Sequence, residues 1–371
     1  MALLSLTTSG VSAMHGFGHA DLFVMSAFVS LVSSMSFWWR DVIAEGTSRF
    51  LNSIKLNKLN ISKVINNEEI ETILTQSTLN KDRVLSLSNL SDDQFGFYLA
   101  GLLEGDGHIS LPYKGKTILN RILNPRIVFT GHKNDLPLYV FVQARLGGIG
   151  RFQIVNDNVI RYIIGDKKGI IHFINIVHGK LKTPKNITFN QLIEFFNMKY
   201  SLSLLTSNLN KSNLLENNWL AGFTEADGSF GVKIVESKSK SEDRKRSVSA
   251  SISLKFRLDQ RLMDKMTSSS MLYIMEEIAN SLSTDLKTYN ESKADKTTVL
   301  SIGVTAIDKL ERVVKYFDKY PLFGVKSKNY SDWRTVYDLI VSKEHLTEQG
   351  RVKIKLIHSN MNNKRVFNNL D

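Results

Sequence analysis

The pattern of hydrophobic and polar positions divides the chain into three regions. Residues 22–39 form an almost uncharged apolar run, whereas residues 48–90 are polar and irregular, with Asn, Lys, Ser and Glu predominating. From residue 91 onward, apolar positions recur with the spacing of amphipathic helices and with the alternation of half-exposed strands. We therefore expect a leader at 1–47, a linker at 48–90 and a folded body after it.

Within this body, one order of elements occurs twice, at 91–205 and at 206–371. Each copy is expected to contain a helix, two strands, a helix, two strands and a closing helix. Two pseudo-symmetric αββαββα repeats predict an α+β fold in which each repeat forms an antiparallel sheet. The expected elements of the first repeat are a helix from a capping box at Ser91 and Gln94 to about Glu104, strands at 108–113 and 126–130, a helix at 135–146, strands at 150–155 and 159–164, and helices at about 167–178 and 187–198. Those of the second are a helix from about Asn217, strands at 230–235 and 248–256, a helix at 271–281, strands at 286–289 and 297–304, and a helix at 307–317.

Both repeats open with similar apolar helix sequences, each of which ends in Glu, a small residue, Asp and Gly. The copies are Leu99-Ala-Gly-Leu-Leu-Glu-Gly-Asp-Gly107 and Leu220-Ala-Gly-Phe-Thr-Glu-Ala-Asp-Gly228. Small residues lie four apart in each copy, so they share one face of the helix and allow the two helices to pack closely. This packing is expected to bring Asp106 beside Asp227. Two carboxylates that close repel each other unless they share a proton or a cation, and a hard divalent metal ion is the expected solution at neutral pH.

Composition and charge favour a polyanion as the partner of the folded body. The chain of 371 residues has a formal net charge of +12, and its first 50 residues contain only two basic residues, Arg40 and Arg49. A basic body with its own apolar core is typical of proteins that bind nucleic acid. The chain has no cysteine, which excludes a disulfide framework and a thiolate metal site. The eight histidines show no metal-ligand spacing, and no phosphate-binding glycine motif is present.

The two nonapeptides at 99–107 and 220–228 resemble the signature motifs of the LAGLIDADG homing endonucleases. C-terminal segments such as Trp333-Arg-Thr-Val-Tyr-Asp-Leu-Ile340 extend the likeness over most of the folded body. Two copies in one chain imply the monomeric, double-motif type. The sixth motif position holds Glu104 and Glu225 rather than aspartate, a variation that leaves the metal positions undisturbed.

This resemblance implies a role for four residues at the motif ends. Asp106 and Asp227 are expected to bind the catalytic metal, with help from the backbone carbonyls of Gly105 and Ala226. The implied cofactor is Mg²⁺, with Mn²⁺ able to substitute. The implied substrate is double-stranded DNA at the intron insertion site, which the enzyme cuts through both strands.

By the same resemblance, the two sheets are expected to form a saddle in the major groove on either side of the cleavage site. One face of each sheet packs on helices, and alternation along the strands leaves the other face to polar side chains. A two-stranded ribbon fits the major groove, where the four base pairs can be distinguished. The sequence leaves open which outward residues read bases and which contact phosphate. The outward-facing candidates are Ser110, Arg126, Gln153, Arg161, Lys233, Ser251, Ser253, Lys255 and Lys287.

A lysine near each metal site would help to stabilise the negative charge that develops on the phosphate during cleavage. Alignment of the two repeats pairs Lys185 with Lys326, and the family carries a basic residue at such a position, so both are assigned catalytic roles by resemblance. Lys182 and Lys328 are nearby alternatives. In a chain this basic, surface solubility is the competing interpretation for any single lysine.

The N-terminal region resembles a different family. Met14-His-Gly16 and Phe37-Trp-Trp-Arg-Asp-Val-Ile-Ala-Glu-Gly-Thr47 look like the early part of cytochrome c oxidase subunit III in its fungal mitochondrial form. The likeness implies an upstream exon read in frame into an intron-encoded protein, and it places the product in mitochondria, in the matrix or at the inner membrane. The apolar run at 22–39 is either a transmembrane helix of minimal length or a buried core helix. Membrane contact would arise only through this leader, if it is retained.

Four functions therefore compete. The first is an intron-encoded homing endonuclease that acts as a monomer on DNA. The second is a maturase that binds the host intron RNA and assists splicing with the same fold, alone or alongside nuclease activity. A non-catalytic DNA-binding protein is disfavoured by the retained Asp106 and Asp227, and a membrane oxidase subunit is supported only by the leader.

Overall fold

The computed structural model describes residues 90–112, 124–156, 158–240, 246–290 and 297–364. The predicted leader and nearly all of the predicted linker lie outside these residues, and so does the apolar run predicted as a membrane span or core helix. Among the described residues, no helix has both the length and the apolar character needed to cross a bilayer.

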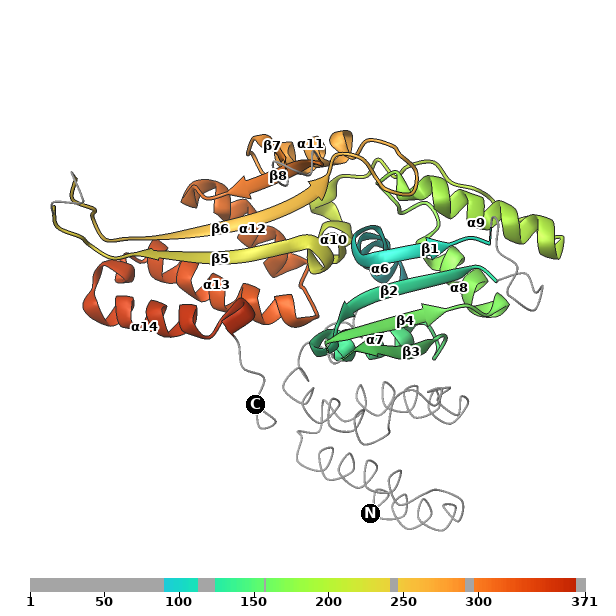
Figure 1. Ribbon diagram of the computed structural model, residues 1–371, viewed down its shortest axis with the longest axis horizontal. Helices are drawn as coiled ribbons and strands as arrows, with labels where there is room; N and C mark the ends of the chain where they lie inside the picture. The colour runs from blue at the N-terminus through green and yellow to red at the C-terminus, as the bar shows by residue number, and fades with distance from the viewer. Residues whose placement is uncertain (1–89, 113–123, 157, 241–245, 291–296, 365–371) are drawn as a thin grey trace, which may run out of the picture. The chain divides into compact units, whose positions relative to one another are not determined.

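The described residues form two repeats with the same order of elements (Figure 1). Mixed helices and antiparallel strands confirm the α+β class. The first repeat closes with the two helices expected for it, whereas three α-helices of the described residues follow the last strand of the second repeat, where one was expected. The first repeat contains α6 (Asp92–Asp106), β1 (Gly107–Ser110), β2 (Arg126–His132), α7 (Leu136–Arg145), β3 (Arg151–Asn156), β4 (Val159–Ile164), α8 (Lys167–Val177) and α9 (Lys185–Tyr200). The second contains α10 (Trp219–Asp227), β5 (Gly228–Val235), β6 (Ser251–Arg261), α11 (Leu272–Ser281), β7 (Leu286–Asn290), β8 (Thr298–Val304), α12 (Ile307–Lys319) and α13 (Val325–Val341), followed by α14 (Glu348–Ser359).

Each repeat folds its four strands into one antiparallel sheet. The strand order is β1-β2-β4-β3 in the first sheet and β5-β6-β8-β7 in the second, which is the same order. The motif glycine pairs with the second strand at the same place in both sheets, with Gly107 opposite Phe129 and Gly228 opposite Leu258. Positions on the two sheets can therefore be compared residue by residue.

The motif helices α6 and α10 pack against each other and join the two repeats, and the sheets lie on either side of them (Figure 1). A Cβ atom added at Gly101 would lie 2.0 Å from the carbonyl oxygen of Trp219, and one at Gly222 would lie 1.9 Å from that of Tyr98. Both distances are far below van der Waals contact, so any side chain larger than hydrogen would push the helices apart. The close packing predicted from the small residues is confirmed.

Helices cover one face of each sheet, and aromatic residues fill the space between them. In the first repeat, Phe129 of β2 packs against Tyr139 of α7 and Phe173 of α8, with ring centroids 6.1 Å apart in both pairs. In the second, aromatic rings of α12 and α13 surround Phe230 of β5. Burial of each such ring contributes roughly 1.5–3 kcal/mol, so these clusters fix the sheets against the helices.

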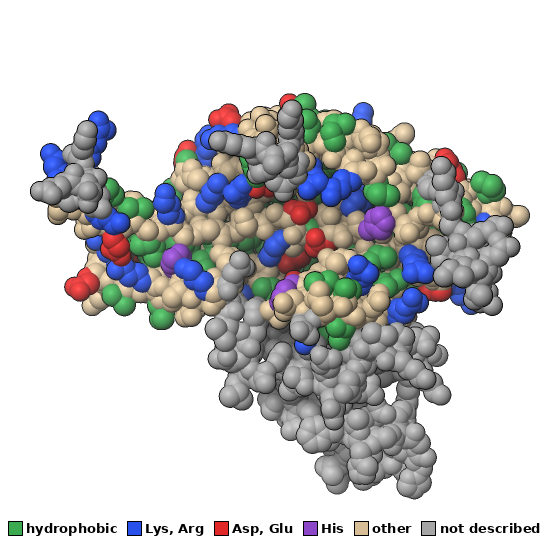
Figure 2. All heavy atoms as spheres, viewed as in Figure 1, with side chains coloured by type: hydrophobic (Ala, Val, Ile, Leu, Met, Phe, Trp, Pro, Cys, Tyr) green, Lys and Arg blue, Asp and Glu red, His purple; other side chains and the backbone are tan. Residues whose placement is uncertain are grey.

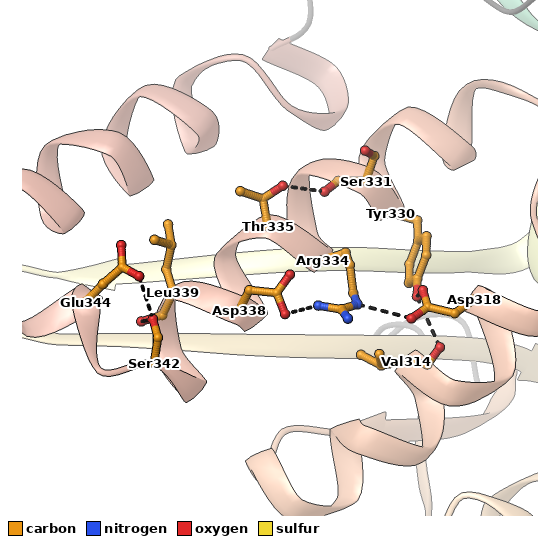
Figure 3. A network of polar contacts seen from close by, with 10 residues as sticks. All are labelled: Val314, Asp318, Tyr330, Ser331, Arg334, Thr335, Asp338, Leu339, Ser342 and Glu344. Carbon is orange, nitrogen blue, oxygen red and sulfur yellow. Dashed lines mark hydrogen bonds and ion pairs between the residues drawn. The ribbon is translucent and has the colours of Figure 1, made fainter. Parts of the chain in front are cut away.

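A polar network connects α12 to α13 at the surface (Figure 3). The Tyr330 hydroxyl donates to Asp318 at 2.5 Å, and the carbonyl oxygen of Val314 lies 3.2 Å from it. The guanidinium group of Arg334 pairs with Asp318 at 3.4 Å and with Asp338. Because these charges are partly exposed, each pair contributes less than about 1 kcal/mol, and the network mainly orients the two helices.

Candidate active site

The two motif aspartates lie at the ends of α6 and α10, where the repeats meet. Asp106 and Asp227 are the last residues of these helices, and the glycine after each one begins the first strand of its sheet. The helix ends are packed as tightly as their centres. A Cβ atom at Gly105 would lie 2.2 Å from the Cβ atom of Ala226 and 3.0 Å from Oδ2 of Asp227. The fold thus brings the four residues predicted as metal ligands into one place.

The surroundings of both carboxylates disfavour the ionised form. Burial, followed by the charge of Asp227, raises the pKa of Asp106 from 3.8 to about 7, although Lys326 and Lys185 oppose this shift. Burial also raises the pKa of Asp227, and it is opposed there by Lys326 and by a hydrogen bond from Gln260. The pair therefore holds a proton readily near neutral pH, and a divalent cation in its place would relieve the repulsion.

The glutamates of the motifs hold the loops that lead into the last helices. Glu104 accepts hydrogen bonds from the backbone N–H groups of Lys182 and Thr183, and from the Thr183 hydroxyl at 2.6 Å. Glu225 accepts one from the backbone N–H of Phe323 at 2.8 Å. Each acid therefore ties the end of its own motif helix to the loop that carries a predicted catalytic lysine.

The same glutamates also bond across the helix pair. Trp219 of α10 donates from its indole nitrogen to Glu104 at 2.5 Å, and Tyr98 of α6 donates from its hydroxyl to Glu225 at 3.1 Å. Tyr98 and Trp219 directly precede the two motif nonapeptides, so the exchange is reciprocal. The glutamates at the sixth motif position, Glu104 and Glu225, thus have a structural role.

The first of the paired lysines reaches the end of α6. The Lys185 ammonium group donates to the carbonyl oxygens of Leu103 at 2.8 Å, Glu104 at 2.9 Å and Gly107 at 2.6 Å. The last carbonyls of a helix have no partner within the helix, so this lysine completes the helix end. It also places a positive charge near Asp106, whose next residue in the chain is Gly107.

The second lysine makes similar contacts at the end of α10. The Lys326 ammonium group donates to the carbonyl oxygen of Thr224 at 3.3 Å and to that of Ala226. The Ala226 carbonyl is one of the predicted metal ligands, and its second lone pair remains for a cation. The alternative lysine, Lys182, instead donates to two backbone carbonyls in the segment that joins the repeats. The geometry therefore favours the predicted pair over Lys182.

Two residues near the carboxylates were not predicted from the sequence as site residues. Gln260 of β6 donates from its side-chain amide to Oδ2 of Asp227 at 2.5 Å. Asp135, which precedes α7, accepts a hydrogen bond from the backbone N–H of Val325 at 2.9 Å and so links the first repeat to the loop that carries Lys326. Both belong to the segment at the end of the second strand of their repeat. Their places beside the carboxylates depend on strand register, which the spacing of residues along the chain does not give.

The nine residues predicted to face DNA all lie on strands of the two sheets. Seven are exposed, while Ser110 and Gln153 are half-buried. Three pairs of these residues lie opposite each other on neighbouring strands: Ser110 with Arg126, Gln153 with Arg161, and Lys233 with Ser253. Figure 2 shows Lys and Arg side chains gathered on both sides of a central group of acidic side chains. This distribution suits a polyanion that crosses the midline of the two repeats.

The second sheet carries a charged network that the sequence analysis also missed. The Arg257 guanidinium group donates to Asp259 at 2.9 Å and to the Tyr289 hydroxyl at 2.9 Å. Ser301 donates to Asp259 at 2.7 Å from the neighbouring strand. These contacts hold Arg257 in one orientation on the second sheet.

The residues at the helix ends fit a divalent cation. Asp106 and Asp227 supply two carboxylates, and two backbone carbonyls lie beside them. Within the described ranges, no group of three or more His, Asp or Glu side chains is arranged to hold a metal. Mg²⁺ commonly uses one or two carboxylates together with water and substrate phosphates, so a set of two carboxylates suits it.

Comparison with known proteins identifies the family. A family model described as LAGLIDADG endonuclease matches residues 99–196 and again residues 220–337. An uncharacterised cox1 intron-2 protein of Schizosaccharomyces pombe is 30% identical to this chain, over 82% of the chain and 85% of that protein. The intron-encoded DNA endonuclease aI3 of Saccharomyces cerevisiae is 28% identical, over 68% of this chain and 65% of its own length. The chain belongs to the LAGLIDADG endonuclease family and carries the family domain twice.

The fold and the leader have separate counterparts. The I-LtrWI LAGLIDADG homing endonuclease, in a crystal structure with its target DNA, matches 74% of this chain and 100% of its own with a TM-score of 0.56 and 21% identity. This likeness is one of fold. A stretch of 47 residues is 49% identical to cytochrome c oxidase subunit 3 of Trichophyton rubrum, over 13% of this chain and 18% of that protein. Its length agrees with that of the predicted leader.

Proposed function

We propose that the protein is a site-specific homing endonuclease that hydrolyses both strands of double-stranded DNA at the intron insertion site of its host gene. The observation that carries this proposal is the convergence of Asp106 and Asp227 at the ends of the motif helices, between two sheets that bear basic residues. Membership of the endonuclease family and a relative named as an intron-encoded DNA endonuclease support it.

Hydrolysis requires attack of a water oxygen on phosphorus, loss of the water proton and departure of a sugar oxygen. A divalent cation, Mg²⁺ or Mn²⁺ in this proposal, supplies activation of the water and stabilisation of the leaving oxygen when bound. Asp106 and Asp227 would hold this cation, with the backbone carbonyls of Gly105 and Ala226 beside them. The two carboxylates also position the water in line with the bond that breaks.

The paired lysines act on the phosphate. The ammonium groups of Lys185 and Lys326 lie at the helix ends beside the carboxylates. We assign them the stabilisation of the extra negative charge that forms on the phosphate oxygens as water adds. Each repeat contributes one aspartate and one lysine to the site. The two sets of residues together cut both strands.

The open faces of the sheets bind the target. Lys and Arg on these faces neutralise phosphates, and polar side chains between them contact base edges in the major groove. The assigned residues are the nine exposed or half-buried strand positions described above. A single chain provides both sheets, so the enzyme acts as a monomer.

The domain organisation and location follow from the leader. We infer that residues 1–47 derive from an upstream exon of an oxidase subunit gene, that 48–90 form a linker, and that 91–205 and 206–371 are the two repeats. The match to cytochrome c oxidase subunit 3 and a relative named for a cox1 intron support a mitochondrial site of action. Contact with a membrane would arise through the leader alone.

The test uses the full-length protein, Mg²⁺ and a plasmid that carries the joined exons on either side of the host intron. We expect the parent protein to linearise the plasmid, and Asp106→Asn and Asp227→Asn to nick it or leave it intact. Asp308→Asn, at an exposed position in the first turn of α12, is the matched control and should cut like the parent. Equal cutting by all four proteins would contradict the assigned roles. Binding of the intron RNA by a parent protein that cuts no DNA would favour the maturase alternative.

A further inference from the structure

The helix that carries Lys326 begins at a carboxylate from the other repeat. Lys326 is the second residue of α13, which begins at Val325. The backbone N–H of Val325 donates at 2.9 Å to Oδ1 of Asp135, which lies 190 residues earlier in the chain. The first N–H groups of a helix have no partner within it, and a negative charge is favourable at this end. Asp135 of the first repeat thus serves as the N-terminal acceptor for a helix of the second.

The Asp135 carboxylate makes this contact instead of capping its own helix. Asp135 directly precedes α7, where an aspartate commonly accepts a hydrogen bond from the next turn, but its side chain makes no such bond. Gly324 gives it room, because a Cβ atom there would lie 2.8 Å from Oδ1 of Asp135 and 2.7 Å from Oε1 of Glu225. The backbone at the start of α13 is therefore enclosed by one acid from each repeat.

Strand register identifies the counterpart of Asp135 in the second repeat. Asp135 lies six residues beyond Phe129, the strand partner of the first motif glycine, and Asp264 lies six residues beyond Leu258, the partner of the second. The Asp264 carboxylate accepts from the backbone N–H and from the hydroxyl of Thr267, both at 2.8 Å, and so closes its own loop. The two equivalent aspartates therefore have different partners.

The last helix of the first repeat begins with a local contact. α9 starts at Lys185, whose backbone N–H donates to the hydroxyl oxygen of Thr183 at 3.3 Å. Thr183 is held in turn by Glu104 of the same repeat. The backbone at Lys185 is thus closed by its own repeat, whereas the backbone at Lys326 depends on both.

We propose that Asp135 is a positioning residue for Lys326, because its carboxylate fixes the first turn of the helix from which this lysine acts. This inference rests on the proposed endonuclease function. The Lys326 ammonium group contacts the carbonyl oxygens of Thr224 and Ala226 at the end of α10, so a shift of α13 moves the positive charge away from the helix end. Small displacements of a group that acts on the reacting phosphate cost much of the rate. Correct placement of this lysine therefore requires the first repeat to be docked on the second.

The test is a double-mutant comparison. The full chain, in excess, is mixed with Mg²⁺ and a joined-exon duplex that carries a different fluorophore on each strand, and single-turnover rates are measured for both. On the strand that Lys326→Met slows most, we expect Asp135→Ala to lower the rate of the parent by about tenfold. Added to Lys326→Met, the same change should lower the rate by less than about twofold, because no lysine remains to be positioned.

Two results would overturn the assignment and leave the endonuclease proposal standing. One is a tenfold loss in the Lys326→Met background as well, which would give Asp135 a purely structural role. The other is an Asp135→Ala protein that cuts both strands like the parent.

A second variant separates the hydrogen bond from the charge. Burial and the charge of Asp227 raise the pKa of Asp106 most, and the charge of Asp135 adds to them, so a direct effect on the cation site is the competing explanation. Asp135→Asn keeps an oxygen that accepts the Val325 N–H and removes the charge. We expect it to cut within about threefold of the parent rate. A rate as low as that of Asp135→Ala would show that the charge acts on the cation site, and would overturn the positioning role.

Asp166→Ala is the matched control. Asp166 precedes α8 in the first repeat, and its carboxylate accepts from the backbone N–H of Gly169 in that same helix at 2.7 Å. This variant should lose stability to denaturant and keep the parent rate on both strands. If it slows cleavage as Asp135→Ala does, loss of an acceptor at any helix start explains the rate, and the assignment is overturned. A parent protein that cuts neither strand overturns the proposed function, and the assignment with it.

Discussion

The indole N–H of Trp219 in α10 donates a 2.5 Å hydrogen bond to the carboxylate of Glu104 in α6. Tyr98, at the equivalent place in the other motif, donates to Glu225 at 3.1 Å. Each motif helix thus supplies the aromatic donor for the acid of the other helix. Because the same acids hold the loops that precede the lysines, helix packing and lysine position depend on one set of hydrogen bonds.

Loss of the indole donor should destabilise the protein more than loss of ring size alone. We expect Trp219→Phe to lower the free energy of unfolding by about 3 kcal/mol, because it leaves a buried carboxylate short of one partner and removes volume. Trp333→Phe is the control, since Trp333 is equally buried and its indole nitrogen has no hydrogen-bond partner within the described part of the chain. It should cost about 1 kcal/mol. Chemical denaturation measures both, and equal losses would contradict this account of Glu104.

The contact between the motif helices should tolerate no added methyl group. In Gly222→Ala, the new Cβ atom would lie 1.9 Å from the carbonyl oxygen of Tyr98, so the helices must separate. We expect a loss of about 3 kcal/mol in the free energy of unfolding, together with loss of activity as the two aspartates move apart. In the control Gly165→Ala, the Cβ atom would lie 3.6 Å from Cγ of Arg126, which is an ordinary contact. A stable and active Gly222→Ala protein would show that the backbones do not approach this closely.

The raised pKa of Asp106 should make the stability of the metal-free protein depend on pH. A carboxyl group whose pKa is 3.8 when unfolded and about 7 when folded binds its proton more tightly in the folded protein. Its contribution is fully present below pH about 4 and is lost as the pH rises through about 7. We expect denaturation in EDTA to show stability falling across this window, with a shallower fall for Asp106→Asn. An identical pH dependence in the two proteins would contradict the shift.

The same linkage predicts how metal binding depends on pH. Because a divalent cation replaces the proton on the carboxylate pair, Mg²⁺ should stabilise the protein more at pH 8 than at pH 6. Thermal unfolding with and without Mg²⁺ at both pH values measures the difference. Stabilisation that is independent of pH, or that persists in Asp106→Asn, would place the cation elsewhere.

Removal of the lysine at the end of α6 should slow catalysis without weakening DNA binding. We expect Lys185→Met to lower the single-turnover cleavage rate by about a hundredfold, because the charge that stabilises the phosphate is lost. Lys182→Met is a matched control, since Lys182 also donates to backbone carbonyls but at the segment between the repeats. It should lose stability and keep its cleavage rate when folded. Equal rates for the two variants would assign Lys185 a purely structural role.

Local patterns were sufficient to predict much of this site, and long-range geometry accounts for the rest. The motif helices follow from residue spacing within each nonapeptide, and Lys185 and Lys326 follow from comparison of the repeats. Gln260 and Asp135 were not predicted. Their positions depend on which strand residue pairs with the motif glycine and on which helix covers that strand, and neither is encoded by spacing along the chain. The closing helix α13 was missing from the predicted elements of the second repeat for a related reason, because its polar and charged residues obscure a regular apolar face.

The most direct test of the shared cation site is anomalous diffraction from crystals of the full chain with Mn²⁺ and a joined-exon duplex. The account predicts an anomalous peak within about 2.2 Å of carboxylate oxygens from both Asp106 and Asp227, with a target phosphate completing the coordination. Mn²⁺ bound only at other residues, or aspartate side chains directed away from each other in that complex, would contradict it.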